Sequence, residues 1–176
     1  MSIARTRPVL PVLLAVLAAA TAMALAPVHT EAAQLQQGPD VERARTLEAE
    51  AHAELAREDV TRWKSAADLF REAASYREDA DAEKVDDLRM AARLAFYARR
   101  EQQATDDAEA AARLALRRGD LLTAAHGYLD AAWMAAEANQ PNRSRELIGE
   151  ARLLAQSPLL AQSVRSDLLG RIQDAA

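Results

Sequence analysis

The chain has 176 residues, no cysteine and a formal net charge of -5 at pH 7. Without cysteine it has neither disulfide bonds nor a lipid-anchored lipoprotein cleavage point, and its basic residues are interspersed with acidic ones, which argues against nucleic-acid binding. Half of the residues are hydrophobic, alanine dominates, and glycine (5) and proline (6) are few, so the composition favours an all-α chain.

The first 32 residues have the layout of a secretory signal peptide. Arg5 and Arg7 precede an uncharged stretch over residues 8–30, and small residues follow the apolar part. The cut sites that fit lie after Ala24, Ala26 and Ala32. An uncleaved anchor is the alternative, and this segment would then be the only membrane contact. We expect export from a bacterial cytoplasm to the periplasm or another extracytoplasmic compartment.

A polar lead-in over residues 33–40 precedes a predicted helical domain over residues 41–173, and Asp40 is placed to cap its first helix. About seven helices are expected: 41–57, 60–77, 82–103, a fourth from Thr105 or Asp106 to Arg118, 121–138, a sixth capped by Asn142, and a seventh with Ser157 as cap and Pro158 in its first turn. Only charge and aspartate capping mark the break at 78–81, so one continuous helix there is the alternative.

Short words repeat along this domain every 20 residues. AARLA stands at 91–95 and again at 111–115, followed in the same register by AAWMA at 131–135 and ARLLA at 151–155. A period in this range indicates a repeat architecture whose units stack on their neighbours. Because the expected connections are short, consecutive helices should pack antiparallel.

A longer word also occurs twice, as WKSAADLFREAA at 63–74 and LLTAAHGYLDAA at 121–132. The shared frame is Ala66, Phe70, Ala73 in the first copy and Ala124, Tyr128, Ala131 in the second, with a weaker copy at Ser144, Ile148, Ala151. Small residues on both sides of an aromatic let two helices approach closely.

This frame resembles the second helix of a tetratricopeptide repeat, and Arg118-Gly119-Asp120 is similar to the turn inside such a repeat. The resemblance implies antiparallel helical hairpins stacked as a short solenoid. The chain departs from the family in its step of 20 rather than about 17 residues. The two copies also start 58 residues apart, and 58 is no multiple of the 34-residue repeat. The third predicted helix, 82–103, is then either an extra helix between two repeats, or the helices pair into hairpins differently from those of the family. A plain antiparallel bundle is the alternative fold.

If the family geometry holds, first-helix residues line a surface for a partner. The resemblance then implies that the fourth helix contributes Asp106, Glu109, Arg113, Leu116 and Arg117, a mixed-charge ridge suited to reading a peptide by charge pairing. Tyr76, Tyr97 and Trp133 are the aromatics expected to be partly exposed, and exposed aromatics serve as anchors for partner peptides.

Catalytic patterns are scarce in the sequence. His126 and Asp130, four residues apart, form the only candidate acid–base pair, and we expect His126 to face solvent with no catalytic role. The carboxylate clusters lack the glycine turn of a calcium loop, and we expect no metal or cofactor.

The sequence therefore predicts an exported, non-enzymatic scaffold that docks a protein or peptide in the cell envelope. The alternative is a helical bundle that self-assembles into a homo-oligomer as a structural or stress-related envelope component.

Overall fold

The computed structural model describes residues 39–57 and 59–175. The predicted signal peptide and most of the lead-in lie outside these residues. The described part of the chain is all-α, with helices α3 (Val41–Leu55), α4 (Trp63–Ser75), α5 (Ala82–Tyr97), α6 (Glu101–Arg117), α7 (Leu121–Glu137), α8 (Pro141–Ala155) and α9 (Gln162–Ala175), and the short 3-10 helix η1 (Val60–Arg62). Over the same residues no helix is both long and apolar enough to cross a membrane.

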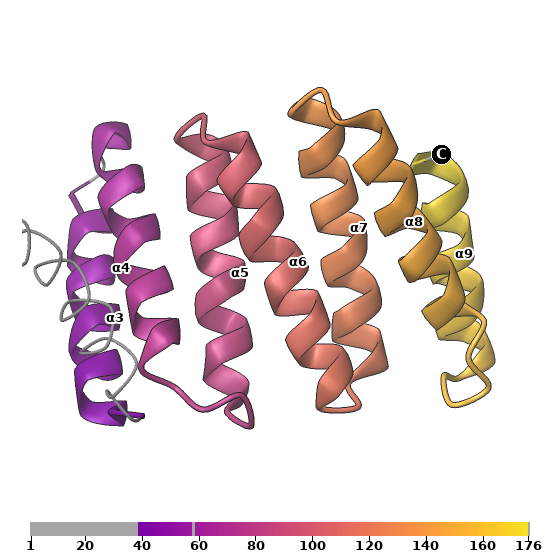
Figure 1. The fold of residues 1–176 in the computed structure, drawn as a ribbon, viewed down its shortest axis with the longest axis horizontal. Helices are drawn as coiled ribbons and strands as arrows, with labels where there is room; N and C mark the ends of the chain where they lie inside the picture. The colour runs from indigo at the N-terminus through magenta and orange to yellow at the C-terminus, as the bar shows by residue number, and fades with distance from the viewer. Residues whose placement is uncertain (1–38, 58, 176) are drawn as a thin grey trace, which may run out of the picture. The chain divides into compact units, whose positions relative to one another are not determined.

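The seven helices follow one another side by side, each antiparallel to the next, so the all-α antiparallel prediction is confirmed (Figure 1). Contacts between every second helix define two layers. In one layer, Asp107 of α6 binds Arg71 of α4, and Arg143 of α8 binds Glu109 of α6. In the other layer, Phe96 of α5 touches Trp133 of α7. The first layer thus contains α4, α6 and α8, and the second contains α5 and α7.

The repeated alanines form the contact surfaces between the helices. The first and last residues of the four repeated words are at most 1% exposed: Ala91, Ala111, Ala131 and Ala151, and Ala95, Ala115, Ala135 and Ala155. Because α5, α6 and α7 are each covered by both chain neighbours, small residues one turn apart let the helices approach closely. Phe70 and Tyr128, the aromatics of the longer word, are also buried.

Three matching turns explain the 20-residue step. The residues Arg99, Gly119 and Asn139 have φ angles of 60°, 80° and 57°, in the left-handed region. The residue after each donates its N–H to the carbonyl five positions earlier: Arg100 to Ala95 at 2.9 Å, Asp120 to Ala115 at 3.0 Å and Gln140 to Ala135 at 2.9 Å. This is the Schellman pattern of helix ends. A helix of 17 residues, as in α6 and α7, plus a three-residue turn completes the step.

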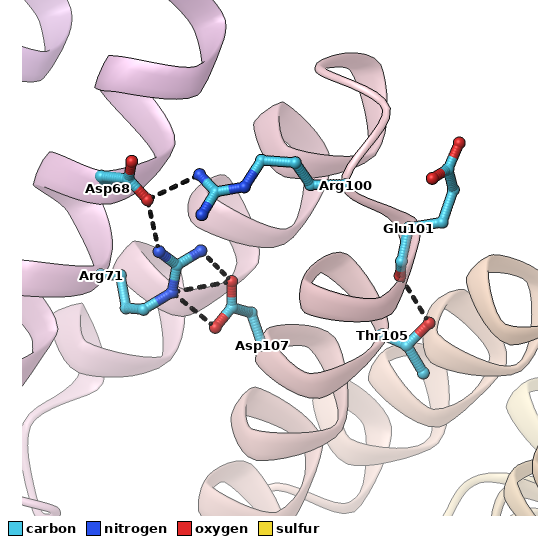
Figure 2. Close-up of polar contacts among 6 residues, drawn as sticks. All are labelled: Asp68, Arg71, Arg100, Glu101, Thr105 and Asp107. Atoms are coloured by element: carbon cyan, nitrogen blue, oxygen red, sulfur yellow. Dashed lines mark hydrogen bonds and ion pairs between the residues drawn. The ribbon is translucent and has the colours of Figure 1, made fainter. Parts of the chain in front are cut away.

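The predicted boundary between the third and fourth helices is wrong. The α5 helix ends at Tyr97 rather than near residue 103, and α6 begins at Glu101, because Arg99 adopts the left-handed conformation without a glycine. Thr105 and Asp106 therefore lie inside α6 and cap nothing. The buried Thr105 hydroxyl donates instead to the Glu101 carbonyl at 2.9 Å (Figure 2).

Two later starts are also corrected. Asn142 is the second residue of α8 and not its cap, since Pro141 opens the helix. The last helix starts at Gln162, and Pro158 lies in the preceding turn, where the Ser157 hydroxyl accepts the Leu159 N–H at 3.3 Å.

Three predicted aspartate caps agree with the structure, but Asp81 before α5 makes no side-chain capping hydrogen bond, and residues 60–62 form η1, so α4 begins at Trp63 rather than at residue 60. The carboxylates of Asp40, Asp59 and Asp120 accept backbone N–H groups of the first turns, at 3.0, 2.9 and 3.0 Å. The chain turns between Ser75 and Ala82, so the alternative of one continuous helix there is wrong.

Candidate peptide-binding groove between α6 and α8

A groove open to solvent runs between α6 and α8. Its first part is a cavity of about 430 Å³ lined by Asp106, Glu109, Ala110, Arg113, Arg117 and Arg143. Its second part, also about 430 Å³, shares Glu109, Arg113 and Arg143 and adds Asn142, Glu146, Leu147 and Glu150. We call the two together the α6–α8 groove.

Arg143 joins the two walls of the groove. Its Nη1 lies 2.7 Å from Asp106 Oδ1, and its Nη2 donates to Glu109 Oε2 at 2.7 Å. Glu109 also pairs with Arg113 on its own helix. A guanidinium that binds carboxylates from a helix two steps away fixes the spacing of α6 and α8 at this end of the groove.

Beyond this bridge the charged side chains are open to solvent. Arg113 and Arg117 on α6 are 64% and 58% exposed, and Glu146 and Glu150 on α8 are exposed as well. Tyr128 of α7 is buried near both walls. Burial, followed by the negative charge of Glu150, raises the pKa of its phenol. Beyond the Arg143 bridge, the α6 wall thus carries two arginines and the α8 wall two glutamates, whereas at the bridge the signs are reversed.

The structure brings together four of the five predicted residues of the fourth helix. Asp106, Glu109, Arg113 and Arg117 all line the groove, as expected for residues three or four apart on one helix face. Leu116 instead packs half-buried against the core. The α8 wall did not follow from the sequence, because nothing in the pattern placed the sixth helix beside the fourth.

The predicted exposed aromatics form a separate group. Tyr97 is 60% and Trp133 51% exposed, while Tyr76 is half-buried against α3. The Tyr97 ring lies 5.4 Å from that of Trp63, and the Trp133 ring lies 4.3 Å from that of Phe96. These aromatics link α4, α5 and α7, and none lines the groove.

His126 differs from its prediction. It is half-buried, and its Nδ1 lies 2.5 Å from Arg171 Nη1 of α9. Burial, then the charge of Arg171, lowers the histidine pKa, so the neutral ring accepts from the guanidinium. Among the hydrogen bonds of residues 39–57 and 59–175, none joins His126 to Asp130. That part of the chain also holds no cluster of three possible metal-ligating side chains.

Two ionic clusters, the first part-buried and the second buried, tie helices together. Figure 2 shows Arg71 between Asp107 and Asp68: its Nε and Nη2 bind Asp107 at 2.9 and 2.6 Å, and its Nη1 binds Asp68 at 2.7 Å. Arg100, in the turn before α6, also donates to Asp68 at 2.7 Å. Burial raises the pKa of Asp107, although the Arg71 hydrogen bond opposes it. This cluster fixes α6 against α4.

In the second cluster, Arg77 binds Asp87 of α5 through Nε at 2.9 Å and also pairs with Glu48 of α3. Arg77 and Asp87 are 6% and 4% exposed. Arg77 thereby connects α3 and α5, and α3 belongs to the layer of α5 and α7. Neither cluster opens into the groove, and both hold helices in register.

No protein-family model matches the chain, and no curated protein or solved structure does. What the fold itself defines is a class of architecture, a sequential stack of antiparallel helices in two layers.

Proposed function

We propose that the chain is an exported, non-enzymatic, tetratricopeptide-like scaffold that docks a protein or peptide of the cell envelope in the α6–α8 groove. The single observation that carries this proposal is the groove itself, whose walls come from two helices of one layer and, beyond the Arg143 bridge, carry opposite charges. The predicted signal peptide supports export.

The tetratricopeptide-like organisation is supported by the alternating layers and by the turn at Gly119, which connects α6 to α7. The two copies of the longer word, in α4 and α7, fall in opposite layers, so they do not mark equivalent helices. The α5 helix between them packs on α4 and α6 like any other member of the stack. The pairing therefore departs from the family pattern, with no extra helix.

Self-assembly is less well supported. The exposed residues of α9 are polar, charged, glycine or alanine, and those of α3 are similar except for Val41. Polar outer faces are what terminal helices of a repeat array need to remain soluble.

Capture of the tagged chain from an envelope fraction tests the proposal. We expect the wild type to retain a stoichiometric partner and the Arg113→Glu/Arg117→Glu variant to lose it. The matched control is Arg45→Glu/Arg57→Glu on the α3 side, because these arginines are 64% and 56% exposed and undergo the same charge change. The proposal fails if the wild type captures no stoichiometric partner, or if the groove variant keeps it.

A further inference from the structure

We propose that the α6–α8 groove selects an extended segment whose charges alternate residue by residue, with basic side chains toward α8 and acidic side chains toward α6. This inference rests on the proposed function and adds the chemistry of the partner.

The walls carry charges with the same spacing. Arg113 and Arg117 lie four residues apart on α6, and Glu146 and Glu150 lie four residues apart on α8. The two helices run parallel, because each is antiparallel to α7 between them. The basic pair and the acidic pair therefore form two parallel rows along the groove.

An extended chain matches these rows in both direction and period. Its successive side chains point to opposite sides, and every second side chain recurs after roughly 6.8 Å. Four residues of an α-helix rise about 6 Å. A segment that lies along the groove with alternating charges thus presents one sign to each wall at nearly the spacing of the wall charges.

The wall charges are available for a ligand. Within residues 39–57 and 59–175, neither Glu146 nor Glu150 has a cationic group within 4.0 Å. Arg113 and Arg117 do have partners, Glu109 and Asp79. The Arg117–Asp79 pair is solvent-exposed, and Glu109, although only 15% exposed, keeps Arg143 as a second partner when Arg113 turns to a ligand. Exposed pairs contribute little, so exchanging a partner costs little.

Segments with other charge patterns fit less well. A run of lysines would place positive charge against Arg113 and Arg117, and a run of glutamates would place negative charge against Glu146 and Glu150. Like charges held this close repel, which gives the groove selectivity against uniformly charged segments.

Two fluorescein-labelled peptides of identical composition test this inference. One alternates Lys and Glu over ten residues, and the other has five Lys followed by five Glu; both are acetylated and amidated and carry the same label at the same position, so their net charges are equal. Binding to the full exported chain is followed by fluorescence anisotropy at low salt, where exposed charges are least screened. We expect the alternating peptide to bind about tenfold more tightly.

Variants locate the binding site. Arg113→Glu/Arg117→Glu should weaken binding of the alternating peptide about tenfold, and Arg45→Glu/Arg57→Glu should leave it unchanged. Adding Glu146→Arg and Glu150→Arg to the groove variant should restore binding, because the peptide then docks with its two faces exchanged. This variant also restores the net charge and so controls for loss of folding.

Equal affinity for the two peptides would overturn the inference, and so would binding that the groove variant leaves unchanged. A chain that captures an envelope partner yet binds both peptides equally would contradict this inference while supporting the proposed function. The two proposals can therefore fail separately.

Discussion

At the scale of single residues, the buried cluster between α3 and α5 consists of the Arg77 guanidinium and the carboxyl groups of Asp87 and Glu48. Burial raises the pKa of Asp87 to about 7 from an ordinary value of 3.8; the Arg77 hydrogen bond opposes this rise, and Glu48 adds to it. Between about pH 4 and 7 the folded chain keeps a proton on Asp87 that the unfolded chain has lost. Asp87 therefore makes the folded state less stable as pH rises through this range.

Asp87→Asn tests this pH dependence. The amide retains hydrogen-bonding groups for Arg77 and Glu48 but does not ionise. The melting temperature of the variant relative to wild type should be higher at pH 8 than at pH 5, by about 4 °C, which corresponds to roughly 1 kcal/mol in a domain of this size.

The variant is compared with wild type at each pH because His126 also contributes a pH dependence. The pKa of His126 is lowered, so this residue destabilises the folded state as the pH falls below 6.5, the ordinary pKa of histidine. A difference in melting temperature that stays constant from pH 5 to 8 would contradict the account.

Gly127 of α7 marks the closest approach of two helices. A Cβ added there would lie 2.9 Å from the Ala112 Cβ of α6, whereas one added at Gly149 of α8 would meet nothing within 4 Å. Gly127→Ala should lower the free energy of unfolding by about 1–3 kcal/mol through overpacking. Gly149→Ala is the matched control and should raise it by about 0.5–1 kcal/mol. Equal effects in urea denaturation would disprove the close approach.

At the scale of elements, the three matching turns differ in what the sequence reveals. Gly119 is a recognised stop signal and the sequence placed that turn correctly. Arg99 adopts the same conformation without any such signal, which is why the predicted third helix ran six residues too far. The Schellman bonds and the packing of α5 against α6 impose the turn there, and neither is visible to a local pattern.

The turns lead to a graded prediction. Arg99→Gly should stabilise the fold by about 1 kcal/mol, because a left-handed conformation costs a residue with a Cβ roughly that much. Asn139→Gly should gain less, since asparagine tolerates this region, and Gly119→Ala should lose about 1 kcal/mol. Thermal unfolding measures all three. A destabilised Arg99→Gly would show that the Arg99 side chain contributes more than its backbone conformation costs.

At the scale of the whole molecule, the described helices form a stack that ends at α3 and α9, which bury fewer residues than the helices between them. Their polar outer faces predict that the chain is a monomer at micromolar concentration. Sedimentation equilibrium checks this expectation. A stable dimer or larger assembly would favour the self-assembling alternative.

Only one wall of the α6–α8 groove could be predicted from the sequence. The ridge of α6 followed from helical spacing and the tetratricopeptide resemblance, since both depend on local residues. The opposite wall required knowing that α8 lies beside α6, which is a property of the stack. Arg143 shows the difference, because its two carboxylate partners lie 34 and 37 positions away in the chain.

The most direct test of the proposed docking is a photo-crosslinking amino acid at Ala110, an exposed alanine that lines the groove. The same substitution at Ala49, exposed on α3, is the control. Irradiation of cells that express the chain should give an adduct with a second protein, expected from the envelope, from position 110 and none from position 49. No adduct from position 110, or the same adduct from both positions, would contradict docking in the α6–α8 groove.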